Sequence, residues 1–261
     1  DFCLSRGLGD VYKRQTTARG AFRSTSGSCD VEELWLVRHG ESVGNVAATA
    51  AEAARAEMIE LASRDADVPL SETGAEQSRA LSAALHGGAI SPQVAWLSPY
   101  LRAQQTFALS MEDAPAVEQV LTDERLRDRE LGILDLLTRW GIAARHPEEA
   151  DRRARLGKYY HRPPGGESWA DVALRLRSFL HDALDADARV GLVVAHDAVV
   201  MLLIALLTGM DEKHLMEFAS ANTVLNASVT RLRFDGEQWR LIDFSDVSHL
   251  EQLGACLLYT S

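Results

Sequence analysis

The chain has little cysteine, fewer basic than acidic residues, and no long apolar run. With 3 cysteines in 261 residues a disulfide scaffold is excluded, and the sequence predicts a disulfide-free cytoplasmic protein. Lys and Arg number 27 against 38 Asp and Glu, and the formal net charge of −11 predicts no nucleic-acid partner and no membrane surface. The longest apolar run, 198–207, is shorter than the roughly 18 residues that a membrane span requires.

What remains is the composition of a globular protein, 46% hydrophobic and 25% charged. We expect a single domain over residues 31–250. Residues 1–15 and 255–261 join no periodic pattern and resemble translated sequencing-adaptor read-through, and residues 16–30 have the composition of a linker. We therefore leave residues 1–30 and the tail at 255–261 out of the fold prediction.

Short apolar runs alternate with helix-forming segments along the domain. The expected elements are strands at 34–37, 94–97 and 190–195, helices at 46–63, 71–85, 100–109, 168–184 and 198–207, and a closing hairpin at 229–234 and 239–244. This order predicts an α/β fold with a mostly parallel central sheet and helices on both faces. Residues 133–166 fall outside the alternation and are punctuated by Pro and Gly, so we expect an inserted helical lid there.

Polar residues follow the three expected strands. They are Arg38-His39-Gly40, Ser98-Pro99 and His196-Asp197. Because the carboxyl ends of parallel strands meet at one edge of a sheet, we expect these residues to share a ligand site. A neutral imidazole is a nucleophile that can attack phosphorus, and a neighbouring guanidinium can hold the phosphate by bidentate hydrogen bonds to its oxygens. Arg102, in the first turn of its expected helix, is best explained by an anion bound at that turn.

Together these motifs resemble the histidine phosphatase superfamily, also called the phosphoglycerate mutase-like family. In chain order they are R-H-G-E-S at 38–42, P-L-S-E-T-G-A-E-Q at 69–77, S-P-Y-L-R-A-Q-Q-T at 98–106, P-G-G-E-S at 164–168 and V-V-A-H at 193–196. The resemblance implies the phosphoglycerate mutase-like fold and a reaction without metal or other cofactor. In that reaction His39 becomes a phosphohistidine, while Arg38, Arg102 and His196 surround the phosphoryl oxygens.

The proton donor is the position at which the sequence departs from the family. The family usually has a Glu four residues before a Gly, and here Asp128 holds that place before Gly132. We favour Asp128 as the acid over Glu130, and in a third interpretation both simply pair with neighbouring arginines. Asp197 stands where the family often has Gly. It would either cap the next helix or raise the pKa of His196 and keep that ring cationic.

Two further residues have two interpretations each. Asn45 is a phosphate contact or a turn residue, and Glu167 lies near the phosphate or is a first-turn helix acid. The segment 125–162 carries ten Lys and Arg residues against six acids, which predicts either a lid that contacts an anionic substrate or a charged helix face.

These residues predict a metal-independent phosphomonoesterase that acts on a small phosphorylated metabolite. The region after Asn45 lacks the F-x-G-W type of sequence found in cofactor-dependent phosphoglycerate mutases, so a mutase is the second interpretation. A non-catalytic module that binds a phosphorylated ligand is the third. The sequence leaves the natural substrate and the oligomeric state open.

Overall fold

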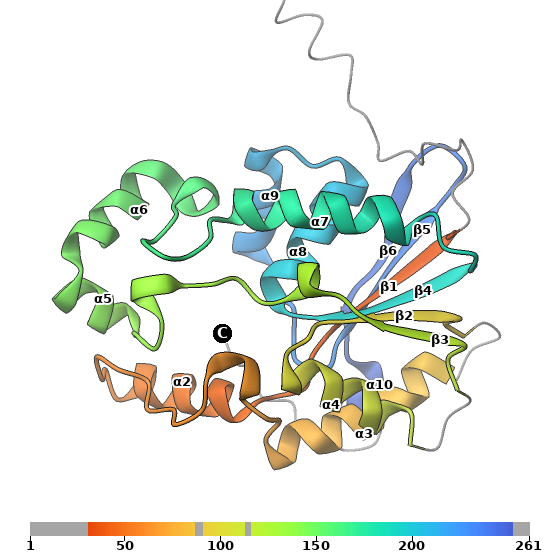
Figure 1. Cartoon of the computed structure of the whole chain (residues 1–261), viewed down its shortest axis with the longest axis horizontal. Coiled ribbons are helices and arrows are strands. Elements are labelled where there is room, and N and C mark those ends of the chain that lie inside the picture. The colour runs from red at the N-terminus through yellow and green to blue at the C-terminus, as the bar shows by residue number, and fades with distance from the viewer. Residues whose placement is uncertain (1–30, 87–90, 113–115, 253–261) are drawn as a thin grey trace, which may run out of the picture.

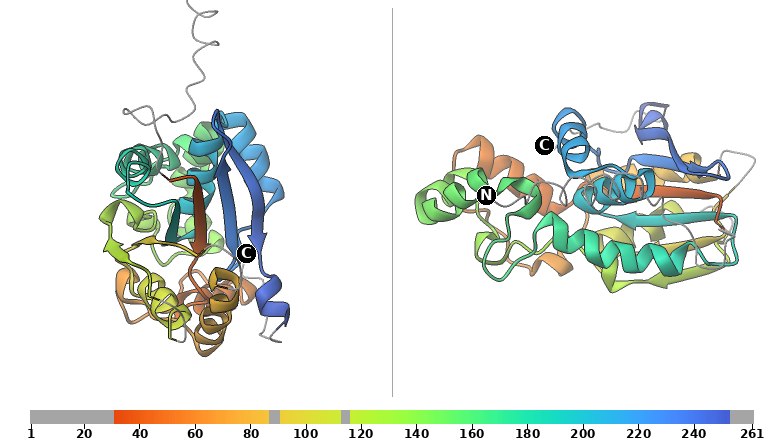
Figure 2. Two further views of the ribbon diagram at one scale, coloured as in Figure 1. Left: turned by 90° about the vertical axis from the view of Figure 1, so that its right-hand side faces the viewer. Right: turned by 90° about the horizontal axis from the view of Figure 1, so that it is seen from above.

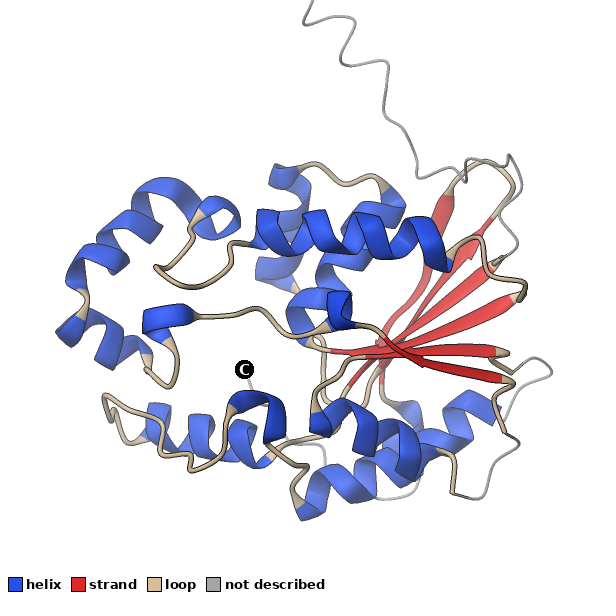
Figure 3. Cartoon of the chain, viewed as in Figure 1, coloured by secondary structure: helices blue, strands red, loops and turns tan. Residues whose placement is uncertain are grey.

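Six strands form one twisted sheet in a computed structural model that describes residues 31–86, 91–112 and 116–252 (Figures 1 and 3). The strands are β1 (Glu33–Arg38), β2 (Val94–Leu97), β3 (Gln119–Thr122), β4 (Val190–Ala195), β5 (Val229–Phe234) and β6 (Trp239–Asp246). Their order is β3-β2-β4-β1-β5-β6. The first four of these run parallel, and β5 and β6 are antiparallel to their neighbours. The expected mostly parallel sheet is confirmed.

Helices cover both faces of the sheet (Figures 1 and 2). The helices around the sheet are α3 (Glu72–His86), α4 (Leu101–Ser110), α7 (Trp169–Ala183), α8 (Asp197–Thr208), α9 (Glu212–Ala221) and α10 (Ser248–Gln252). Strand β1 shows how the two layers share the sheet. Leu34 and Leu36 join the core under α7 and α8, while Trp35 and Val37 join the core over α3 and α4. Because β1 is buried on both faces of the sheet, its sequence is a continuous apolar run.

The helix expected at 46–63 is wrong beyond residue 53, because α2 spans only Val43–Ala53. Arg55 has a φ of 53°, which turns the chain out of the helix. Residue Met58 then forms a bridge with Leu137, and Ile59 N donates to the Leu136 carbonyl at 2.8 Å. No residue of α2 is buried, so an extended helix would have had no core to pack against.

The segment predicted as a lid, residues 133–166, is helical and leaves the sheet. It contains η3 (Gly132–Leu134, which begins one residue earlier), α5 (Arg139–Arg145) and α6 (Pro147–Tyr160), and follows η2 (Glu124–Leu126). Seen from above, this lid segment extends away from the strands (Figure 2). Thr138 holds it against the chain that follows α2, since its hydroxyl donates to the Ala56 carbonyl and its N–H to that of Glu57. The lid segment is therefore docked on the α2 side of the molecule.

The strand register brings the predicted motifs to one level at the carboxyl edge. Arg38 pairs with Ala195, and Leu97 pairs with Val194. Just beyond these pairs, His39 N donates to the Ala195 carbonyl at 3.0 Å, and Ser98 N donates to the Val194 carbonyl at 3.0 Å. Three polar segments that are far apart in the sequence therefore meet beside one another.

We expect Gly74→Ala to destabilise the protein. Gly74 lies in the first turn of α3, where an added Cβ would overlap the Glu41 carbonyl in the loop that follows β1. Such overpacking against backbone costs about 2–3 kcal/mol in the free energy of unfolding. Gly209→Ala is the control: it has a φ of 71° but nothing within 4 Å, and its cost is about 1 kcal/mol. Denaturant unfolding measures both, and equal losses would contradict the close approach.

Candidate active site

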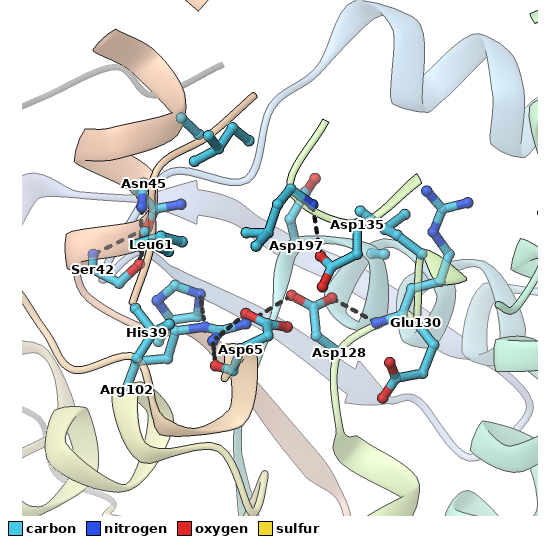
Figure 4. A pocket seen from close by; sticks show the side chains of 18 of the residues that line it. His39, Ser42, Asn45, Leu61, Asp65, Arg102, Asp128, Glu130, Asp135 and Asp197 are labelled. Atoms are coloured by element: carbon cyan, nitrogen blue, oxygen red, sulfur yellow. Dashed lines mark hydrogen bonds and ion pairs between the residues drawn. The ribbon is translucent and has the colours of Figure 1, made fainter. Parts of the chain in front are cut away.

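A cavity of about 390 Å³ opens at the carboxyl ends of β1 and β4, a volume that suits a small ligand. Six of the eight predicted site residues line it: Arg38, His39, Asn45, Arg102, Asp128 and Glu130. His196 lies directly behind, with its ring centroid 5.2 Å from that of His39. Glu167 does not line the cavity. Figure 4 shows the side chains of His39, Arg102 and Asp128 pointing toward one another.

The His39 ring is held in one orientation. Its Nδ1 lies 2.7 Å from the Gly40 carbonyl, which identifies Nδ1 as the protonated nitrogen. Burial lowers the pKa of His39 well below its ordinary value, and the charges of Arg102 and Arg38 lower it further. The ring is therefore neutral near pH 7, with its lone pair on Nε2, the nitrogen that faces Arg102. A neutral imidazole fixed in this way is a nucleophile.

Arg102 is a buried cation whose nitrogens are all engaged by protein groups. Its Nε donates to His39 Nε2 at 3.2 Å, and its Nη2 donates to Asp128 Oδ2 at 3.1 Å. Its Nη1 donates to the carbonyl and the carboxylate of Asp65, in η1 (Asp65–Asp67), at 2.7 and 3.0 Å. The guanidinium thus presents its planar fork to the cavity, and the two carboxylates occupy the positions at which phosphate oxygens would bind.

His196 is neutral, contrary to one interpretation of the sequence. Burial lowers its pKa to about 3, although the neighbouring Asp128 acts in the opposite direction. Its Nε2 lies 2.8 Å from the Ser98 hydroxyl, and its Nδ1 lies 3.4 Å from Asp128 Oδ2. The expectation that Asp197 keeps the ring cationic is wrong, because desolvation outweighs every nearby carboxylate. Asp197 also does not cap α8, whose N-cap is His196; it is a first-turn acid that lines the cavity.

Two buried nitrogens beside the cavity lack hydrogen-bond partners within the described residues. They are Arg38 Nε and His196 Nδ1. Arg38 is anchored through Nη1, which donates to the Val224 carbonyl at 2.6 Å. Buried polar atoms are rarely left unpaired unless a ligand or water satisfies them. A ligand rich in oxygen acceptors would satisfy both.

Asp128 and Glu130 both reach the cavity but have different surroundings. Burial raises the pKa of Asp128, but the opposing effects of its neighbours, among them the charge of Arg102 and the N–H of Arg129, leave the net pKa below the ordinary value. Asp128 is therefore ionised in the free site. Glu130 contacts neither histidine through a hydrogen bond; instead it accepts one from the Tyr100 hydroxyl at 3.2 Å.

The two interpretations of Asn45 are compatible. Its Oδ1 accepts from Ser42 N and Ser42 Oγ, both at 3.0 Å, which completes the capping box of α2. The amide NH₂ of the same side chain remains as a donor at the cavity. Glu167 is different, because it pairs with Arg127 at 2.9 Å and with Arg175 at 3.0 Å. Its carboxylate also accepts the N–H of the cavity-lining Glu130 at 3.2 Å, so Glu167 holds that loop in place without lining the cavity itself.

Some basic residues of segment 125–162 line the cavity, as expected for a lid that contacts an anionic substrate, and others form surface ion pairs, as expected for a charged helix face. Arg129 and Lys158 line the cavity, and Lys158 Nζ lies 4.2 Å from the Trp169 ring centroid. Others form ion pairs away from the cavity: Arg125 with Asp123 and Asp182, Arg139 with Glu52, Arg145 with Glu57, Arg152 with Glu149 and Arg162 with Asp171. Two lid-side cations can therefore contact a ligand.

Three residues of the site were given no individual role from the sequence. Ser98 follows a predicted strand and holds His196, so its position in the motif was an available signal. Asp65 carries no such signal, because only the folded η1 brings it to Arg102. Asn226 is 187 residues from His39 along the chain, and its side chain donates to the His39 carbonyl at 3.0 Å.

No group of three or more His, Cys, Asp or Glu in residues 31–86, 91–112 and 116–252 could hold a metal ion. No helix in those same ranges has the length and apolar character needed to cross a membrane.

A nucleophilic imidazole between buried guanidinium groups defines a site for phosphoryl transfer. The family model of the histidine phosphatase superfamily (branch 1) matches residues 34–247, and the chain belongs to that family. A 2,3-bisphosphoglycerate-dependent phosphoglycerate mutase from Gloeobacter violaceus is 33% identical over 168 residues, 62% of this chain and 69% of the mutase. A metal-independent phosphoserine phosphatase from Arabidopsis thaliana is 28% identical over 230 residues, 86% of each chain.

Solved structures agree with this assignment. Mycobacterial glucosyl-3-phosphoglycerate phosphatase in complex with VO3 has a TM-score of 0.63 and 28% identity, over 82% of this chain and 99% of that protein. The YhfR protein of Bacillus stearothermophilus has a TM-score of 0.66 and 26% identity, over 84% and 98%. The phosphoglycerate mutase-like fold is therefore established for this chain.

We expect Asp65→Asn to strengthen phosphate binding. The Asp65 carboxylate competes for Arg102 and repels a dianion, so the variant should bind inorganic phosphate about fivefold more tightly at pH 7. Burial raises the pKa of Asp65, while Arg102 partly offsets this. The gain should therefore shrink as acid protonates the wild-type carboxylate.

Titration calorimetry with inorganic phosphate at pH 7 and pH 5 measures the effect. Asp67→Asn is the matched control, because Asp67 pairs with the exposed Arg64 in the same short helix. Weaker phosphate binding by Asp65→Asn than by the control would show that Asp65 supports the anion site instead of competing with it.

Proposed function

We propose that the protein is a metal-independent phosphomonoesterase that forms a phosphohistidine at His39. The observation that carries the proposal is the buried, neutral His39 ring, whose Nδ1–H is bonded to Gly40 and whose Nε2 faces the Arg102 fork. The substrate is a small phosphorylated metabolite, and the cavity volume of about 390 Å³ suits a compound of that size. The cytoplasmic location expected from the sequence stays a prediction.

In the first step the Nε2 lone pair of His39 forms a bond to phosphorus as the bond between phosphorus and the ester oxygen breaks. Arg38, Arg102 and the NH₂ group of Asn45 bind the phosphoryl oxygens. Gly40 stabilises the charge that develops on the ring, because its carbonyl accepts the Nδ1–H. His196 is neutral and acts as a hydrogen-bonding group rather than as a cation.

Asp128 supplies a proton to the leaving oxygen in this scheme. The carboxylate is ionised in the free site, partly because Arg102 binds it. A bound phosphomonoester adds negative charge and draws Arg102 to itself, and both effects raise the pKa of Asp128. In the second step Asp128 takes a proton from water, the water oxygen bonds to phosphorus, and the bond to Nε2 breaks.

A mutase remains the second candidate, since relatives of both kinds match the chain. The two reactions share the phosphohistidine and differ in whether water or a hydroxyl of a second substrate takes the phosphoryl group. A non-catalytic phosphoryl-binding module is the third candidate. Release of inorganic phosphate from a phosphomonoester favours the first, transfer to phosphoglycerate the second, and phosphate binding without turnover the third.

We expect His39→Ala to lose turnover of p-nitrophenyl phosphate in EDTA by roughly 10³-fold or more, because the nucleophile is gone. Acid quenching of the wild type with labelled substrate should trap an acid-labile phosphoprotein that the variant lacks. His181→Ala, on the exposed face of α7, is the control. A folded His39→Ala protein with wild-type activity would refute the proposed nucleophile.

Asp128→Asn and Glu130→Gln distinguish the proton donor. We expect Asp128→Asn to lose more activity on alkyl phosphates than on p-nitrophenyl phosphate, since a poor leaving group needs the proton and a good one does not. Glu130→Gln should affect both substrates alike. The measurement is the ratio of kcat/KM on the two esters for each variant. The opposite pattern would assign the acid to Glu130.

A further inference from the structure

One wall of the active-site cavity is apolar. Ile59, Leu61 and Val68 line it from the chain between α2 and α3, and Leu136 and Leu137 line it from the lid segment. A second, more open hollow adjoins this wall and shares Ile59, Leu61 and Leu136 with it. The rest of its lining is Met58, Ala62 and one acidic residue, Glu60. The apolar surface therefore begins beside the phosphate site and continues toward solvent.

Packing and backbone pairing fix the position of this wall. Leu61 Cδ1 and Val68 Cγ1 lie over Gly44 in the first turn of α2, 3.6 and 3.3 Å from where a Cβ of Gly44 would stand. Figure 4 shows Leu61 beside Asn45. The two halves of the wall are joined by the bond from Ile59 N to the Leu136 carbonyl, 2.8 Å long. The wall is a preformed surface and does not need a ligand to assemble it.

Leu136 holds its place at a conformational cost. Its φ is 55°, in the left-handed region that glycine and asparagine tolerate and leucine rarely adopts. Strained residues of this kind cluster at functional sites, where the side chain is needed in that position. Here the leucine side chain is only half buried, and it borders both hollows.

The rest of the lining is mixed. It includes the charged residues Arg129, Lys158 and Asp197, from the loop before the lid segment, from α6 and from α8, and the apolar residues Leu131, Trp169 and Ala198. Asp65 and Asp135 lie nearer the apolar wall, but Asp65 is bound to Arg102, and Asp135 accepts the N–H of Leu136 at 3.0 Å. An alcohol with many hydroxyl groups would leave some of them against apolar side chains, without partners.

We propose that this wall is a specificity subsite for the apolar part of the substrate alcohol, so that the preferred substrates are phosphomonoesters with an alkyl or aryl group. The inference rests on the proposed function, because the alcohol is placed by the phosphoryl group at His39. Leu136, Leu61 and Ile59 are the specificity-determining residues.

The experiment compares two esters that differ only at the far end of the chain, pentyl phosphate and 5-hydroxypentyl phosphate. We expect wild-type kcat/KM to be roughly tenfold higher for pentyl phosphate, the size of discrimination that an apolar pocket gives against an added hydroxyl. Binding of the two matching phosphonates, which cannot be hydrolysed, is measured separately by titration calorimetry.

Leu136→Asn is the key variant, because asparagine has nearly the shape of leucine, tolerates a φ of 55° and is polar. We expect it to reduce the pentyl preference to about twofold or less, because kcat/KM falls more for pentyl phosphate than for the hydroxylated ester. Leu136→Gly, which also accepts this backbone, should act in the same direction. Leu156→Asn is the matched control, since Leu156 is 42% exposed on α6 and does not line the cavity.

The outcomes separate the two proposals. Turnover of both esters with no preference in the wild type would overturn the subsite and leave the phosphatase intact. No turnover, together with tighter binding of the pentyl phosphonate, would refute the phosphatase and support the subsite. A preference that Leu136→Asn and Leu136→Gly both leave unchanged would also overturn the assignment.

Discussion

The burial of two guanidinium groups around a neutral imidazole is the constraint on which this structure depends. Arg38 and Arg102 are withdrawn from water beside His39. Within the described residues Arg38 Nε has no hydrogen-bond partner, whereas Arg102 is held by His39, Asp65 and Asp128. Desolvation and mutual repulsion of these two cations are unfavourable, and a bound phosphate dianion would offset both by neutralising their charge. The guanidinium groups are therefore in place before a ligand arrives, and a bound phosphoryl group has only to replace the carboxylate partners of Arg102.

Much of this arrangement follows from sequence patterns that obey strong local rules. The short apolar runs before Arg38, Ser98 and His196 have the profile of buried parallel strands, and as such strands they bring their ends to one edge of the sheet. The helices expected at 168–184 and 198–207 are α7 and α8, and they lie between local signals: the capping box of Ser168 with Asp171 starts α7, and Gly209 ends α8. These signals lie within a few residues of the feature that they determine.

Other features depend on contacts that no local pattern encodes. The exposed edge strand β3 has four residues and packs against one neighbour, and α9 is a short amphipathic helix, so neither was predicted. The end of α2 depends on pairing with residues about 80 positions later. His196 is neutral because it is completely buried, and the position of a histidine at the end of a predicted strand does not show how deeply the ring is buried. In each case the deciding partner is distant in the chain.

The lid segment illustrates how such a protein can change. Thr138 and the ion pair of Arg145 join it to the chain after α2, and the ion pair of Arg139 joins it to Glu52 within α2. None of these contacts involves a strand. Sequence drift at Leu136 or Leu61 can therefore remodel what the cavity admits while strand register stays fixed. Gene duplication followed by change in this one segment would produce paralogues with new substrates and the same chemistry.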